Sequence, residues 1–158
     1  MGLDMFLRAE KYFSSYSDAD IRDKLEKVLN KKFQSCNINL ECGYWRKANQ
    51  IHNWFVENCQ DGEDDCKEYE VSREELIELK EICEKVVKIL SEQTRNEHDI
   101  YEDTTEIEEL LPTKAGFFFG GYEYDENYLN DIIDTIRIIN KCLEDFDESW
   151  NFSYRSSW

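Results

Sequence analysis

The segment from Gly43 to Cys59 most constrains the fold, because its side chains separate into two faces at helical spacing. At about 100° per residue, one face carries Ala48, Ile51, Phe55, Asn58 and Cys59, with Trp54 at its edge. The opposite face carries Arg46, Gln50, Asn53 and Glu57. Gly62 follows as a residue suited to the position after a helix end. The pattern predicts an amphipathic helix, and we expect the core to be assembled on it.

Three other segments have helical periodicity. The first extends from Ser17 or Asp18, either of which can cap it, to about Lys32. Its apolar face consists of Ile21, Leu25, Val28 and Leu29. The second begins at Ser72, which can form a capping box with Glu75, and reaches about Thr94. The third follows Asp125 and directs Leu129, Ile132, Ile136, Ile139 and Leu143 inward.

Alternation of apolar and polar side chains predicts strands over residues 3–13, 33–42 and 149–155. Residues 110–122 contain an apolar run bounded by glycines, which predicts a strand that is buried on both faces at the centre of a sheet. About four helices and four strands in mixed order indicate an α+β fold with a small, mostly antiparallel sheet. The chain has 158 residues and one proline, so we predict one domain over residues 1–158.

The formal net charge of −17 restricts the classes of partner. Carboxylates are concentrated in residues 61–70 and 97–109, which we interpret as acidic loops, with a short helix as the alternative for the second. Such a surface repels nucleic-acid phosphates and anionic membranes, and it attracts basic proteins. We therefore expect no direct nucleic-acid binding and no membrane binding. The N-terminal residues lack a signal-peptide pattern, so we expect a cytoplasmic protein.

The sequence gives no sign of catalysis. It lacks the nucleophile-elbow, zinc-protease, phosphate-loop and dinucleotide-binding motifs. Its only histidines are His52 and His98. His98 precedes Glu102 in an acidic run, which is more typical of a solvated histidine than of a metal ligand, and His52 borders the apolar face of the central helix. We predict that the protein is not an enzyme and that it has no cofactor.

Cysteines and carboxylates do not form a recognisable metal motif either. The six cysteines lack a C-x-x-C spacing, and without a secretory signal we interpret them as reduced thiols. Cys59 and Cys66 flank the acidic residues 61–65 and are the one pair that leaves a metal site open. The acidic loop 61–70 lacks the ligand register of a calcium loop. We predict no bound metal.

Four segments of the sequence resemble a family of small bacteriophage and prophage proteins, mostly from Firmicutes. The resemblance rests on Met1-Gly2-Leu3-Asp4-Met5, on Gly43–Phe55, on Leu111-Pro112-Thr113 with Gly116–Gly120, and on Ser156-Ser157-Trp158. It spans nearly the whole chain. The resemblance implies a phage product that acts in a bacterial cytoplasm, where small acidic phage proteins often bind and block host proteins, including components of antiviral defence. It implies no catalytic residue.

The leading hypothesis is an acidic interaction protein that binds and inhibits a host protein with a basic surface. Two acidic belts on one face could imitate the phosphates of a duplex and occupy a nucleic-acid-binding protein. The residues of this acidic-surface hypothesis are Asp61, Glu63, Asp64, Asp65, Glu97, Asp99, Glu102, Asp103, Glu106, Glu108 and Glu109. The oligomeric state stays open.

The alternative hypothesis is a protein that binds or sequesters a small molecule or nucleotide. An aromatic pocket around the central helix would stack a base, and Arg46 or Lys47 would meet its phosphate. The residues of this pocket hypothesis are Tyr44, Trp45, Arg46, His52, Trp54, Phe117, Phe119 and Tyr122. Aromatic side chains at helical and strand spacing are also what an ordinary core requires.

Overall fold

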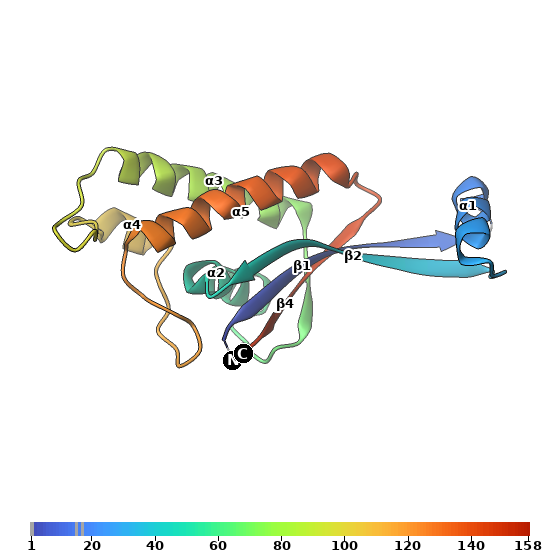
Figure 1. Ribbon diagram of the computed structural model, residues 1–158, viewed down its shortest axis with the longest axis horizontal. Coiled ribbons are helices and arrows are strands. Elements are labelled where there is room, and N and C mark those ends of the chain that lie inside the picture. The colour runs from blue at the N-terminus through green and yellow to red at the C-terminus, as the bar shows by residue number, and fades with distance from the viewer. Residues whose placement is uncertain (1, 15, 17) are drawn as a thin grey trace.

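The computed structural model describes residues 2–14, 16 and 18–158 (Figure 1). Within these residues the chain forms five helices and one four-stranded sheet, which confirms the α+β class with one helix more than predicted. In chain order the elements are β1 (Asp4–Ser14), α1 (Ala19–Leu29), β2 (Ser35–Arg46), α2 (Asn49–Cys59), β3 (Glu68–Val71), α3 (Arg73–Ser91), α4 (Thr105–Leu110), α5 (Glu126–Asp145) and β4 (Asn151–Ser157). The additional helix, α4, lies in the acidic segment 97–109 and just beyond it.

The sheet is antiparallel throughout, with the strand order β2-β1-β4-β3. The first and last strands therefore pair at its centre, with Met5 opposite Ser156 and Ala9 opposite Phe152. Helices α2, α3 and α5 lie on one side of the sheet, and α3 and α5 pack against each other (Figure 1). Side chains of β1 alternate between buried and partly exposed, so only one face of the strand contributes to the core.

One predicted strand is wrong. Residues 112–125 form a loop, and the Phe117 side chain at its tip is 96% exposed. Its backbone groups are satisfied by single contacts instead of a ladder: Leu3 N donates to Phe118 O, and the Asn49 amide donates to Phe119 O and Gly121 O. The fourth strand is instead β3, four residues at the sheet edge that sequence reasoning assigned to the acidic loop 61–70.

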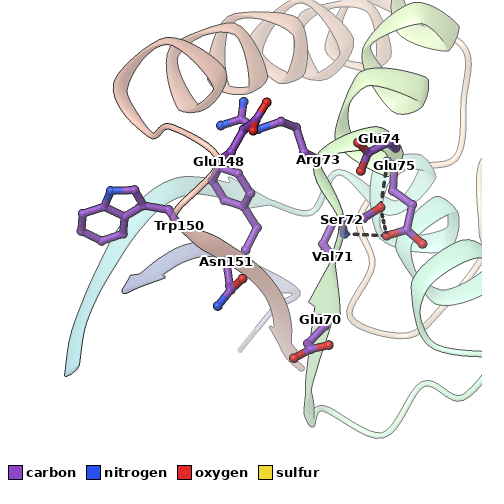
Figure 2. Close-up of a pocket in the computed structure, with 10 residues that line it drawn as sticks. Glu70, Val71, Ser72, Arg73, Glu74, Glu75, Glu148, Trp150 and Asn151 are labelled. Carbon is purple, nitrogen blue, oxygen red and sulfur yellow. Dashed lines mark hydrogen bonds between the residues drawn. The ribbon is translucent and has the colours of Figure 1, made fainter. Parts of the chain in front are cut away.

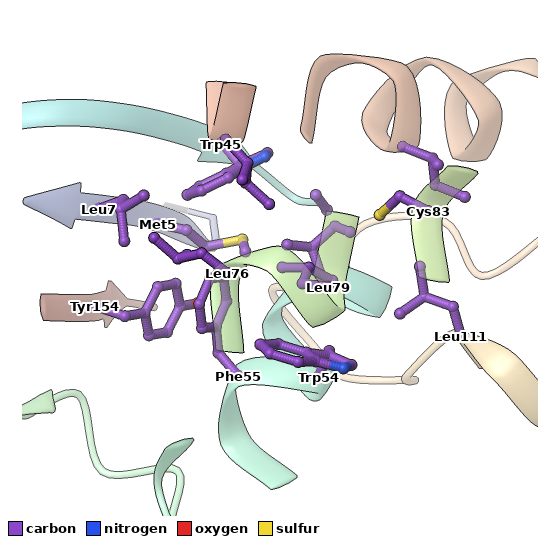
Figure 3. Close-up of a cluster of buried hydrophobic side chains, with 14 of the residues drawn as sticks. Met5, Leu7, Trp45, Trp54, Phe55, Leu76, Leu79, Cys83, Leu111 and Tyr154 are labelled. Atoms are coloured by element: carbon purple, nitrogen blue, oxygen red, sulfur yellow. The ribbon is translucent and has the colours of Figure 1, made fainter. Parts of the chain in front are cut away.

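The core is built around α2, as predicted, although this helix begins at Asn49 because β2 continues to Arg46. Figure 3 shows β1, α2, α3 and β4 side chains meeting there, with the Phe55 and Tyr154 rings stacked at 4.0 Å between centroids. The Trp45 indole donates to Thr135 Oγ1 at 2.9 Å. Gln50, predicted on the polar face of α2, is buried, because the loop 112–125 and α5 cover that side of the helix.

The hairpin of β1 and β2 extends beyond the rest of the sheet. Pairing between β1 and β4 ends at Glu10, whereas pairing between β1 and β2 continues to Ser14 opposite Ser35. The distal hairpin therefore has two strands, and α1 connects them at its far end (Figure 1). We call residues 11–38 the arm. The described remainder of the chain is the body.

Candidate binding surfaces

Helix α1 exposes the face that the sequence marks as apolar. Ile21 is 40% exposed, Leu29 57% and Val28 81%, while Leu25 is half-buried. The expected helix is present, but its apolar face is not part of the core. Asp18 occupies the N-cap position without a side-chain bond to the helix, and the alternative cap, Ser17, lies outside the described residues. The helix thus presents an apolar stripe to solvent.

A buried carboxylate explains how α1 is oriented. Glu26, on another face of the helix, is 8% exposed and accepts from Lys32 Nζ at 2.5 Å and from Phe33 N at 3.3 Å. Charge-assisted hydrogen bonds are stronger than neutral ones. These contacts hold the Glu26 side of the helix against the returning chain, so Val28 and Leu29 face outward.

The arm and the rest of the chain differ in net charge. The arm contains six lysines and arginines against four acidic residues, whereas the remaining residues contain thirteen against thirty-two. The arm is therefore weakly basic on a chain whose net charge is −17. Figure 1 places α1 at one end of the long axis and the segment of residues 97–109 with α4 at the other. Opposite charges thus lie at opposite ends.

The two acidic belts are separate. All seven carboxylates of residues 97–109 are exposed, at the end of the molecule opposite the arm. Residues 61–65 instead lie in the loop after α2, close to the end of β4 (Figure 1). Two of them make internal contacts, since Asp64 contacts His52 and Asp65 contacts Lys67. The belt of residues 97–109 is an exposed acidic surface, in which Asp99 pairs with Arg95. It consists of Glu97, Asp99, Glu102, Asp103, Glu106, Glu108 and Glu109.

The eight residues of the pocket hypothesis do not surround one cavity. Trp45, His52, Trp54 and Phe119 are buried in the core or at its edge. Tyr44 is on the opposite face of the sheet, where its hydroxyl contacts Asp4 and its ring contacts Phe6. Phe117 and Tyr122 are exposed on the loop 112–125. One of the eight, Arg46, lines the cavity that lies where β2 meets α2.

His52 belongs to a buried hydrogen-bond network. Its Nδ1 lies 2.8 Å from the Tyr154 hydroxyl and its Nε2 lies 3.0 Å from Asp64 Oδ2. The Trp158 indole donates to the other oxygen of Asp64 at 3.0 Å. Burial lowers the pKa of His52 and outweighs the opposing effect of Asp64. A neutral imidazole that donates from Nε2 and accepts at Nδ1 satisfies both partners. The network joins α2 to the loop that follows it and to β4.

A cavity of about 350 Å³ lies where β2 meets α2, beside the loop 112–125 and the start of α5. Asp131 is half-buried in its wall and accepts from Gln50 Nε2 at 3.2 Å. Burial, together with the charges of Asp134 and Asp125, raises the pKa of Asp131 to about 6. Sequence reasoning missed Asp131 and Gln50. A carboxylate one position before Ile132, within the apolar stripe of α5, was the available signal.

A larger cavity of about 530 Å³ lies between the start of α3 and the segment before β4 (Figure 2). Ser72 and Glu75 form the predicted capping box there, shown by the dashed lines. Arg73 donates to the Leu143 and Phe146 carbonyls and its guanidinium lies over the Phe152 ring. These contacts fix the C-terminal end of α5 against α3. Of the charged groups of this cavity, Arg73 and Glu75 are therefore engaged in holding the fold together.

Comparison of the chain with protein-family models, curated proteins and solved structures gives no match. All six cysteines are free thiols. Among the described residues, no three histidine, cysteine, aspartate or glutamate side chains come together as a metal site. In the same residues no helix is long and apolar enough to span a membrane. The candidate surfaces are therefore the exposed face of α1, the acidic end and the Asp131 cavity.

Proposed function

We propose that the protein is an interaction protein, which docks on a host protein through the apolar face of α1. The observation that carries this proposal is the exposure of Ile21, Val28 and Leu29 at the end of the arm. Amphipathic helices that place such a face in a groove are a common mode of protein recognition. The bacterial cytoplasm, the phage origin and inhibition of the host protein enter the proposal through the family resemblance.

The charge of the arm indicates the chemistry of the partner. Lys24 and Lys27 lie on the helix that carries the apolar face and Lys31 follows its end, whereas Arg22 pairs with Asp23 and Lys32 pairs with Glu26. The three lysines suit an apolar groove with carboxylates on its rim. In the other version of the proposal, the acidic end attracts a partner with a basic surface. Charge chiefly changes association rate and specificity, whereas buried apolar area contributes most to affinity. This favours α1 as the docking element.

A pull-down from a Firmicutes host lysate with matched variants tests the proposal. The tagged full chain is compared with Val28→Asp on the arm, with Ile133→Asp as an exposed apolar control on α5, and with Glu106→Lys plus Glu109→Lys at the acidic end. We expect an identified partner that is retained by the last two proteins and lost with Val28→Asp. Loss only with the lysine variant supports the basic-partner version. Equal capture by all variants rejects both.

A further inference from the structure

The Asp131 cavity contains charged groups that the docking proposal does not use. Its volume of about 350 Å³ lies near the lower end of the range for small-molecule sites. The residues around it come from segments that are far apart in the sequence: Arg46, Lys47 and Gln50 from the junction of β2 and α2, Glu123 from the loop before α5, and Asp131 from α5. The fold thus brings the cations Arg46 and Lys47 and the carboxylates Glu123 and Asp131 to one cavity.

Asp131 supplies a negative charge that is poorly compensated within the protein. The buried Gln50 amide donates to one of its oxygens, and no lysine or arginine in the described chain forms an ion pair with it. Asp125, also at the cavity, already accepts from Tyr128 N and from Asn127. A half-buried carboxylate without a cation is unfavourable unless a ligand provides one. This wall is therefore suited to a protonated amine.

Arg46 and Lys47 supply positive charge to the lining of the same cavity. Arg46 Nε reaches Asp4 only at 4.0 Å, and Lys47 forms no ion pair within the described residues. The backbone of Lys47 is held at a positive φ of 62°, with its N–H donating to Leu3 O at 2.8 Å. A Cβ atom at Gly120 would lie 3.0 Å from Lys47 Cβ, so the loop packs closely on this residue. The position of Lys47 is thus fixed by a strained backbone beside the cavity.

We propose that this cavity binds a free α-amino acid, whose ammonium group faces Asp131 and Glu123 and whose carboxylate faces Arg46 and Lys47. A lining that contains both cationic and carboxylate side chains is complementary to a zwitterion. A nucleotide, the ligand of the earlier alternative, carries several negative charges and would enter a site with three carboxylates on a chain of net charge −17. The charge distribution therefore favours the zwitterion over the nucleotide.

Thermal-shift and calorimetric titrations test this site on the full chain. The probes are the twenty protein amino acids, each at 10 mM, together with AMP and with the N-acetylated form of any amino acid that binds. We expect at least one amino acid to raise the melting temperature and its N-acetylated form to have no effect. A free ligand in excess stabilises the folded state in proportion to the logarithm of its concentration over Kd.

Matched variants show whether binding occurs at Asp131. We expect Asp131→Asn to weaken binding at least tenfold and Lys47→Gln to weaken it by a similar factor. Asp134→Asn, the same substitution on an exposed position of α5, should leave Kd unchanged. A shift with AMP alone, no shift with any amino acid, or binding that survives both cavity variants would overturn the proposal. Lys47→Gln keeps the test valid if Asp131→Asn does not fold.

Discussion

Helices α1 and α2 each have eleven residues and one apolar face, yet they occupy opposite surroundings. Helix α2 lies between the sheet, α3 and the loop 112–125, so that even the polar Asn49, Gln50 and His52 are buried. Helix α1 lies beyond the last β1–β4 pair, where the hairpin has only two strands. The difference shows that amphipathicity defines which face of a helix is apolar. The extent of the sheet determines whether the chain has other elements to bury that face.

Truncation of a core side chain should produce the largest loss of stability among these variants, and it tests whether the core of the body is built on α2. Phe55 is fully buried and stacks on Tyr154, so Phe55→Ala should lower the free energy of unfolding by about 3–5 kcal/mol. Urea denaturation followed by tryptophan fluorescence measures the change. A loss below about 1 kcal/mol would show that α2 is not the centre of the core.

Removal of the Asp131 charge should stabilise the body. The pKa of this group rises from an ordinary value of 3.8 to about 6 on folding. Its contribution to stability is therefore fully present below the unfolded pKa and is lost as pH rises through about 6. At pH 7.5 Asp131→Asn should raise the unfolding free energy by about 2–3 kcal/mol, with the gain disappearing near pH 4.

Parallel urea titrations of wild type and Asp131→Asn between pH 4 and 8 measure that difference. His52 has a lowered pKa, so its contribution is present above its unfolded pKa and is lost as pH falls through the folded one. Both proteins retain His52, so its effect cancels in the comparison. An Asp131→Asn variant that is less stable than wild type at pH 7.5 would contradict the account of this carboxylate.

Substitution of the N-cap residues of α3 and α1 should change the free energy of unfolding by smaller and unequal amounts. Ser72 accepts from Glu75 N in a complete capping box, so Ser72→Ala should cost about 1 kcal/mol. Asp18 makes no capping bond to α1 and accepts from Ser14 N at 3.4 Å, so Asp18→Ala should lower global stability less than Ser72→Ala does. Thermal unfolding by circular dichroism compares the two variants. Equal losses would mean that α1 is coupled to the body as tightly as α3.

Substitution of Val28 should have the smallest effect on stability. Its side chain is 81% exposed, so Val28→Asp should stay within about 0.5 kcal/mol of wild type. The same change should remove partner binding, which separates recognition from folding. Unfolding curves of the purified variant measure the first effect. A large loss of stability would show that the apolar face of α1 packs within the chain.

Local sequence patterns predicted most helices and strands, because the spacing of apolar residues in these elements matches the spacing of their buried side chains. The β1 alternation, the capping box at Ser72 and the core role of α2 all follow from neighbouring residues. The apolar run 117–119 misled the prediction because its backbone is satisfied by Asn49 and Leu3, which are distant in the sequence. The four-residue β3 lies among acidic residues and has too few side chains to show a period.

The candidate surfaces were less predictable than the fold. Composition indicated an acidic surface, and residues 97–109 provide one. Spacing along the chain could not show that residues 61–65 lie on a different part of the molecule from residues 97–109. The Asp131 cavity depends on tertiary contacts between Gln50 and α5 across 81 positions. Exposure of α1 depends on where β4 stops pairing, which no pattern within α1 encodes.

Site-specific photo-crosslinking in host cells tests the central claim that α1 docks on a partner. A photoreactive amino acid is placed at Val28 on the arm and, as a control at a less exposed apolar position of the body, at Ile77 on α3. The account predicts that position 28 crosslinks to one host protein and that position 77 does not. Crosslinks from position 28 only within the chain or to a second copy, or the same products from both positions, would contradict it.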